Sequence, residues 1–357
     1  MTRIHGGRIF EASAKLNRGW FNIIDFSANI NPFGQPARLK DVLFEAYDLT
    51  LHYPEERAQS FISGLSRYFD LEESYFLPGP GSTIHIYLLA RLLGQGSNVI
   101  IGPAFSEYEA AIKAAGGQFV YVNAGPDNLF AVTMAMVETV FSHNPTAIFL
   151  ANPANPTGRL IPEPVLEALL AESQAKKIPL IVDEAFLDFT TAETLLHKVK
   201  THPNLVVLRS LTKIMAVPGL RLAYLVAAPD LVSRLWDHLG PWPLSALAIQ
   251  AGNFFVDIQY GSSFDLRKKL DPLESALYPV LNQIGHPYPT QANFALLHMV
   301  PQHTDEAIDF FFQKGLLVRD CRDFNGLGLG WLRFAIRPKK EIEILDQLIK
   351  ELCARAT

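Results

Sequence analysis

The sequence predicts an α/β protein with a large domain built on a seven-stranded, mostly parallel sheet and a smaller α+β domain. From about residue 74 to 227, short runs rich in apolar residues alternate with segments of helical length. Several of these runs, such as 147–150, are apolar throughout, which is typical of strands buried on both faces. After Asp237 the pattern changes to helical stretches broken by glycine and proline, followed by shorter strands.

The expected elements follow one another along the chain. The seven strands of the large domain are expected at 75–77, 98–101, 118–122, 146–150, 180–182, 205–208 and 222–226. Helices are expected between them at 82–93, 107–115, 163–176 and 192–199. The smaller domain should contain strands at 294–299, 316–318 and 332–336. Parallel strands need long crossover connections, so this alternation predicts helices on both faces of the large sheet.

The chain divides into three parts by composition. Residues 1–35, rich in Gly, Asn and Pro, are expected to form an ordered arm that contributes to the site. Residues 36–237 are the predicted large domain. Residues 238–357 are expected to form an interdomain helix region and the small C-terminal domain.

Composition limits the classes of function. The 357 residues, 49% of them hydrophobic, are enough to bury a large core. The net charge is only -5 and no long basic run occurs, so neither nucleic acid nor a membrane surface is an expected partner. Two cysteines, no secretory leader and no membrane-spanning apolar run favour a cytoplasmic protein. The ten histidines show no metal-binding spacing, so no catalytic metal is expected.

A glycine-rich turn, Gly79 to Thr83, follows the first predicted strand and precedes a predicted helix. Backbone N–H groups at the start of a helix carry partial positive charge and bind phosphate groups. Gly81, Ser82 and Thr83 are therefore candidate phosphate ligands. Such a turn also serves simply to connect a strand to a helix, so its meaning depends on the rest of the site.

Two further motifs follow later strands, at the edge where the carboxyl ends of parallel strands form a ligand crevice. Segment 152–158 reads Asn-Pro-Ala-Asn-Pro-Thr-Gly. It can aim the Asn155 amide at a ligand, or fold as a turn whose Asn side chains bond their own backbone. Asp183 follows the apolar run 180–182, where its carboxylate can hold a protonated ring nitrogen or cap the next segment.

Lys213 completes the pattern. It ends the segment Ser-Leu-Thr-Lys at 210–213 and is followed by Gly219 and Arg221. An amine for a Schiff base, a carboxylate for a pyridine nitrogen, and hydroxyls with a guanidinium for a phosphate are what a pyridoxal phosphate enzyme needs. The chain supplies each group in order at successive predicted strand ends. We therefore predict pyridoxal 5'-phosphate as the cofactor and Lys213 as the catalytic residue.

These motifs resemble those of the fold type I pyridoxal phosphate enzymes, most closely the branch containing threonine-phosphate decarboxylase and, next to it, histidinol-phosphate aminotransferase. The resemblance covers nearly the whole chain. It depends on Asn-Pro-x-Asn-Pro-Thr-Gly, on Asp-Glu-Ala, and on Ser-x-Thr-Lys followed after five residues by Gly-x-Arg. It implies the fold of that family, with a large cofactor-binding domain and a smaller α+β domain.

The resemblance also implies roles for single residues. Lys213 would hold the cofactor covalently, Asp183 would pair with the pyridine nitrogen, and Asn155 would hydrogen-bond the ring hydroxyl. The phosphate would be held by the turn at Gly81 and by Ser82, Thr83, Ser210 and Arg221. Phe105 would stack on the ring, its alternative being a core aromatic. Tyr53 would reach the phosphate bound by the neighbouring subunit, which implies a homodimer. Phe186 stands where many aminotransferases of this fold carry Tyr, so one hydrogen bond to the ring hydroxyl should be missing.

Segments 5–7, 26–34, 241–246 and 318–321 resemble threonine-phosphate decarboxylase more than histidinol-phosphate aminotransferase. This implies decarboxylation of L-threonine O-3-phosphate to aminopropanol phosphate, a precursor of the cobalamin side chain. Arg333 is the candidate ligand of the substrate carboxylate, because guanidinium binds carboxylate through two parallel hydrogen bonds. His5, Asn29 and Arg319 are candidates for the substrate phosphate. The structural alternatives are surface ion pairs for the arginines, a mobile arm for His5 and a turn for Asn29.

Two other classes of function stay open at this stage. An aminotransferase acting on histidinol phosphate or a related amino acid would use Lys213 to shuttle a proton and would need a keto acid acceptor. A pyridoxal-binding regulator without catalytic activity is the third class, although no added DNA-binding segment is visible in the sequence.

Overall fold

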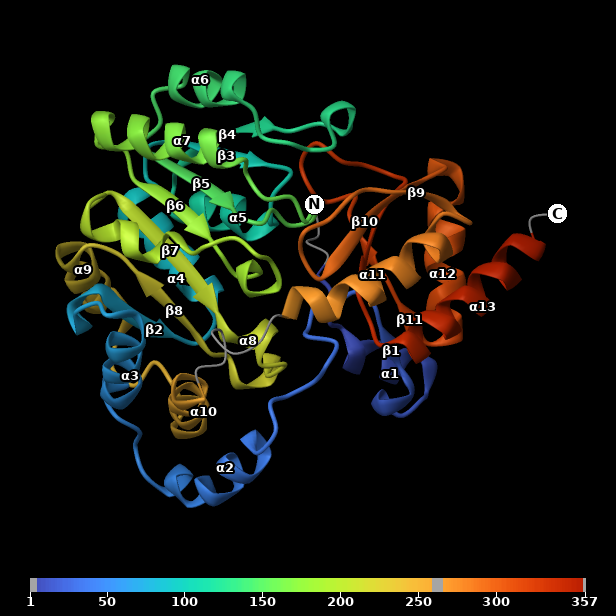
Figure 1. Ribbon diagram of the computed structural model, residues 1–357, viewed down its shortest axis with the longest axis horizontal. Coiled ribbons are helices and arrows are strands. Elements are labelled where there is room, and N and C mark those ends of the chain that lie inside the picture. Colours follow the sequence, from blue (N-terminus) through green and yellow to red (C-terminus); the bar gives the residue numbers. More distant parts are fainter. Residues whose placement is uncertain (1–4, 259–265, 356–357) are drawn as a thin grey trace.

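A seven-stranded sheet forms the centre of the larger part of the molecule (Figure 1). The computed structural model describes residues 5–258 and 266–355. Strand order across the sheet is β2-β8-β7-β6-β5-β3-β4, and only β8 runs antiparallel to its neighbours. The strands are β2 (Phe76–Gly79), β3 (Ser97–Gly102), β4 (Gln118–Asn123), β5 (Ala147–Ala151), β6 (Leu180–Asp183), β7 (Leu205–Ser210) and β8 (Ala223–Val226). The predicted mostly parallel seven-stranded sheet is confirmed.

Helices cover both faces of this sheet, because successive side chains of each strand point to opposite faces. In β5, Ile148 and Leu150 join one hydrophobic cluster, whereas Ala147 and Phe149 join another. The helices around the sheet are α3 (Gln59–Phe69), α4 (Ser82–Leu93), α5 (Ser106–Ala114), α6 (Met134–Ser142), α7 (Glu163–Lys176), α9 (Pro229–Leu239) and α10 (Ala246–Asp257). Two of them, α4 and α7, have the predicted bounds.

One predicted helix takes a different form. Residues 192–199 were expected to be α-helical, but the segment forms the 3-10 helix η6 (Leu195–Lys200). Its start is fixed by Glu184, which accepts hydrogen bonds from Thr194 Oγ1 and the Leu195 backbone N–H. The other 3-10 helices are η1 (Trp20–Asn22), η2 (Tyr47–Leu51), η3 (Glu73–Tyr75), η4 (Pro126–Asn128), η5 (Leu187–Phe189), η7 (Pro218–Leu220) and η8 (Pro301–His303).

A second, antiparallel sheet lies beside the first, in the order β12-β13-β10-β9 (Figure 1). Its strands are β9 (Gly285–Pro287), β10 (Phe294–Met299), β12 (Arg319–Asp320) and β13 (Trp331–Ala335). The helices α11 (Leu266–Leu281), α12 (Thr304–Lys314) and α13 (Lys339–Arg355) belong to the same part of the chain. The predicted strands at 294–299 and 332–336 are β10 and β13.

The N-terminal segment is joined to this smaller part. It forms α1 (Ile9–Leu16) and β1 (Ile24–Asp25), and β1 pairs in parallel with β11 (Leu316–Leu317), the third strand predicted there. The chain then crosses to α2 (Leu39–Glu45) and α3 on the side of the large sheet (Figure 1). Residues 1–4 of the predicted arm lie outside the described residues. Among the helices of the described part, none is long and apolar enough to cross a bilayer.

Candidate active site

A cavity of about 630 Å³ opens at the carboxyl ends of β5, β6 and β7, where parallel strands are expected to form a ligand crevice. Ala151 and Asp183 end two of these strands, and Lys213 follows the third. Residues of the N-terminal arm and of the small sheet complete its wall. The predicted residues that line it are His5, Asn29, Ser82, Thr83, Phe105, Asn155, Asp183, Lys213, Arg221, Arg319 and Arg333.

Lys213 lies half-buried in the short helix α8 (Leu211–Ile214), directly after β7. Its Nζ donates to Thr212 Oγ1 at 3.0 Å and to Ser210 Oγ at 3.3 Å. Burial lowers the pKa of Lys213 to about 8; Asp183 opposes this shift, and the positive charges of Arg221 and Arg333 add to it. A lysine with such a pKa presents a larger neutral, nucleophilic fraction than an exposed lysine.

Asp183 is held by two donors. Its Oδ2 accepts from Tyr108 Oη at 2.9 Å, and its Oδ1 accepts from the Ala185 backbone N–H at 3.0 Å. Burial raises the pKa of Asp183, and these hydrogen bonds and nearby Lys213 act in the opposite direction. Burial also raises the pKa of Tyr108 well above its ordinary value, so this phenol stays a donor. Sequence reasoning missed Tyr108, although it lies only three residues after Phe105, in the first turn of α5.

The glycine-rich turn forms a narrow cradle beside Arg221. Gly81 has a φ of +88°, which strains any residue with a Cβ, and a Cβ at this position would lie 2.3 Å from Arg221 Nη2 and displace the guanidinium. Ser82 and Thr83 begin α4 and line the cavity. Ser210 is buried beside Lys213 and is not among the lining residues. A helix start, two hydroxyls and a guanidinium are suited to a phosphate dianion.

Two buried polar side chains in the cavity wall have unused hydrogen-bonding atoms. Arg333 is 6% exposed and donates to Asn155 Oδ1 and, at 2.9 Å, to the Ser27 carbonyl. Within the described residues its Nε has no partner, and neither amide atom of Asn29 has one. Burial lowers the pKa of Arg333 to about 10. Buried polar atoms without partners are costly, so this part of the wall is suited to a polar ligand.

Arg319 and His5 also line the cavity, and each of them contacts an acidic side chain. Arg319 is 3% exposed, donates to both carboxylate oxygens of Asp323 at 2.8 and 3.1 Å, and lies 4.9 Å from the Phe324 ring. It is therefore a buried ion pair and not the surface pair considered as its alternative. His5 Nε2 lies 3.1 Å from Glu107 Oε1.

Tyr53 lies on the surface of the molecule and outside the cavity. Its side chain is 82% exposed, its ring lies 4.8 Å from that of Trp242, and it is not among the residues that line the cavity. A contact with a cofactor would therefore have to be made outside this chain's own cavity.

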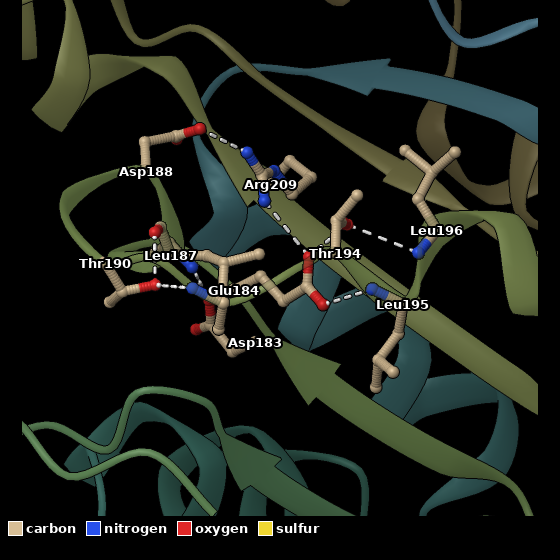
Figure 2. Close-up of polar contacts among 11 residues, drawn as sticks. Asp183, Glu184, Leu187, Asp188, Thr190, Thr194, Leu195, Leu196 and Arg209 are labelled. Atoms are coloured by element: carbon tan, nitrogen blue, oxygen red, sulfur yellow. Dashed lines mark hydrogen bonds and ion pairs between the residues drawn. The ribbon is translucent and has the colours of Figure 1, made fainter. Parts of the chain in front are cut away.

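A buried charge network lies next to Asp183 (Figure 2). Arg209 in β7 contacts Glu184 at 3.0 Å and Asp188 at 2.5 Å, and Glu184 also binds Thr194 and Leu195. Burial raises the pKa of Glu184, and Arg209 opposes that shift. The network fixes the loop that follows β6, and with it the backbone that carries Asp183.

The site fits pyridoxal 5'-phosphate on structural grounds. The Gly81 turn leaves room for a phosphate, Asp183 offers an oriented carboxylate, and Lys213 offers an amine of lowered pKa in the same cavity. Fold and site together define a fold type I enzyme whose cofactor is pyridoxal 5'-phosphate. Residues 22–352 match the family model of aminotransferase class I and II, and the chain belongs to that family.

The chain is similar in sequence to known proteins with two different activities. The chain is 34% identical over 348 residues to threonine-phosphate decarboxylase of Salmonella typhimurium, covering 96% of this chain and 94% of that protein. It is 30% identical over 328 residues to histidinol-phosphate aminotransferase of Methanococcoides burtonii, covering 90% and 88%. The solved structure of L-threonine-O-3-phosphate decarboxylase from Porphyromonas gingivalis superposes with a TM-score of 0.82 at 25% identity, covering 93% of this chain and 100% of that one.

Proposed function

We propose that this enzyme decarboxylates L-threonine O-3-phosphate to aminopropanol phosphate, a precursor of the cobalamin side chain. The observation that carries the proposal is a pair of buried arginines, Arg319 and Arg333, in the wall of the cavity that also holds Lys213. A substrate with both a carboxylate and a phosphate matches two such cations. The similarity to threonine-phosphate decarboxylase over nearly the whole chain supports the same substrate.

In the proposed reaction, the bound cofactor supplies an electron sink for the pair released when a bond to the substrate Cα breaks. Only a bond perpendicular to the cofactor plane can break in this way, so the residues that orient the substrate select the reaction. Arg333, held by Asn155 and Ser27, would bind the substrate carboxylate and set its orientation. Arg319, Asn29 and His5 would bind the phosphate.

The remaining steps need an acid, a base and a fixed charge. The amine of Lys213 would deliver a proton to the substrate Cα after carbon dioxide has left, a task suited to its pKa of about 8. Asp183, with Tyr108 and the Ala185 N–H as donors, would keep its negative charge next to the pyridine nitrogen. Ser82, Thr83, Ser210 and Arg221 would hold the cofactor phosphate.

The test is a direct assay of the purified, cofactor-loaded protein with L-threonine O-3-phosphate. We expect release of carbon dioxide and formation of aminopropanol phosphate in equal amounts, and loss of both in Lys213→Ala. A wild-type protein that binds the substrate but releases no carbon dioxide would refute the proposal.

The second candidate is an aminotransferase acting on histidinol phosphate, supported by the similarity to the Methanococcoides burtonii enzyme. The same protein would then be incubated with histidinol phosphate and 2-oxoglutarate. Formation of glutamate without carbon dioxide release would favour this candidate over the decarboxylase.

We also propose a cytoplasmic homodimer in which Tyr53 reaches the cofactor phosphate of the neighbouring subunit. The exposed ring of Tyr53, outside its own cavity, supports this arrangement. Phe44, Tyr47 and Leu51, from α2 and η2, are also strongly exposed apolar side chains, which is typical of a surface that a partner covers. Cys321 and Cys353 are both free thiols, which suits a reducing compartment.

A further inference from the structure

Glu107 is a buried acid in the cavity wall. The proposed function gives it no role in binding the cofactor or the substrate. It is the second residue of α5, and its residue exposure is 6%. A carboxylate in the first turn of a helix is favoured by the helix dipole, and Glu109 on the same turn meets that need. The dipole does not explain why Glu107 is buried, because burying a carboxylate is unfavourable unless it is paired.

Two partners of Glu107 come from other segments of the chain. Tyr87 Oη, on α4, donates to Glu107 Oε2 at 2.9 Å. His5 Nε2, on the N-terminal arm, lies 3.1 Å from Glu107 Oε1. The carboxylate therefore joins the arm to α4 and α5. Ser82 and Thr83 lie in the first turn of α4, and Phe105 directly precedes α5.

The arm has one close-fitting position on the cavity wall. The Gly7 backbone N–H donates to Ser27 Oγ at 2.9 Å, and a Cβ on Gly6 would lie 2.1 Å from the Ser27 carbonyl oxygen. Arg333 donates to that same carbonyl oxygen at 2.9 Å. Beyond Gly6, the His5 ring lies 6.0 Å from the Phe105 ring. The glycines allow the backbone to approach Ser27, and His5 then reaches across the cavity to α5.

We propose that Glu107 is a positioning residue: it docks residues 5–7 over the cavity through His5 and so completes the part of the site that binds the substrate phosphate. With Nε2 engaged by Glu107, the Nδ1 atom of His5 would serve the substrate phosphate. The role in phosphate binding rests on the proposed function, whereas docking of the arm does not depend on any substrate.

The test compares Glu107→Gln with Glu109→Gln in the cofactor-loaded protein. Glu109 is the matched control, because it lies on the same turn of α5 and contacts Lys113 and Tyr121 instead of the arm. Two quantities are measured: hydrogen exchange of the N-terminal peptide containing Gly7, without substrate, and the Kd of L-threonine O-3-phosphate from the cofactor absorbance.

For Glu107→Gln we expect faster exchange of the N-terminal peptide and a Kd about tenfold higher, the loss expected of one charge-assisted hydrogen bond, with kcat within about twofold. Glu109→Gln should change neither quantity. Unchanged exchange, or a fall in kcat with unchanged Kd, would overturn the proposal.

Two further variants keep the test decisive if Glu107→Gln does not fold. Tyr87→Phe retains the carboxylate and removes the hydroxyl that orients it, so it should give the same changes to a smaller extent. His5→Ala should weaken binding at least as much as Glu107→Gln, because it removes both the contact with Glu107 and the imidazole itself. Where Glu107→Gln folds, the double variant should bind no more weakly than His5→Ala alone, because the role of Glu107 acts through His5. Additive losses in the double variant would contradict the proposal. A wild-type protein that does not bind threonine phosphate would refute the proposed function, and the exchange data would still decide the docking role.

Discussion

Single charged residues around Lys213 determine how readily it reacts. Burial lowers its pKa to about 8, Asp183 opposes the shift, and Arg221 and Arg333 reinforce it. Arg333 thus has two effects in the proposed site: it would bind the substrate carboxylate, and its charge keeps a larger fraction of the lysine neutral.

The first prediction concerns the pH dependence of cofactor uptake by the cofactor-free protein. Because only the neutral amine attacks the aldehyde, the rate should rise with pH and level off above about 8, well below the range of an ordinary lysine. Arg333→Met removes a charge that lowers this pKa, so the plateau should move to higher pH. The control is Arg337→Met, whose guanidinium pairs with Glu341 at 2.7 Å. Stopped-flow absorbance measures the rate, and equal profiles for the wild type and Arg333→Met would contradict the account.

At the scale of elements, the buried network of Glu184, Asp188 and Arg209 ties β7 to the loop after β6 (Figure 2). Arg209 and Glu184 have side-chain exposures of 7% and 0%, so neither charge is compensated by water. Removing one partner of a buried pair leaves an unpaired buried charge, which costs more than the pair itself contributes.

The second prediction follows from this burial. Arg209→Met should lower the free energy of unfolding by about 3 to 5 kcal/mol, since it leaves Glu184 and Asp188 without their cation. Lys198→Met, which breaks the more exposed pair with Glu167, should cost less than about 1 kcal/mol. Urea denaturation of the cofactor-free proteins measures both. Equal losses in the two variants would be inconsistent with the network's proposed role.

The sequence predicted those elements whose local pattern is strong. The apolar runs of the large sheet and the helices α4 and α7 could be located because burial on both faces, or helical length, leaves a clear signal. The strands β1 and β12 have two residues each and exist only through pairing with β11 and β13, so no periodicity could indicate them. The 3-10 helix η6 was likewise decided by a distant residue, Glu184.

The same distinction holds for the site. Asp183 and Lys213 could be predicted because chain order alone places them at neighbouring strand ends. The bond from Tyr108 to Asp183 joins residues 75 positions apart, and the pairing of His5 with Glu107 joins the arm to α5. Such contacts depend on the packed structure and leave little trace in local composition.

At the scale of the whole molecule, the cavity draws its wall from both sheets and from the N-terminal arm, while Tyr53 faces outward. The third prediction is that the protein is a dimer and that Leu51→Asp, at a side chain 78% exposed, disrupts it and weakens cofactor retention. Phe21→Asp, at a side chain 73% exposed in η1, is the control and should remain dimeric. Light scattering coupled to gel filtration gives the mass. A monomeric wild type that retains its cofactor would contradict the proposed arrangement.

The most direct test of the whole account is the identity of the residue that holds the cofactor. Cofactor-loaded protein is reduced with borohydride, digested, and the peptides carrying the cofactor label are sequenced by mass spectrometry. We predict one labelled peptide, modified at Lys213, and none in Lys213→Ala. A label on a different lysine, or no label on cofactor-saturated wild type, would contradict the account.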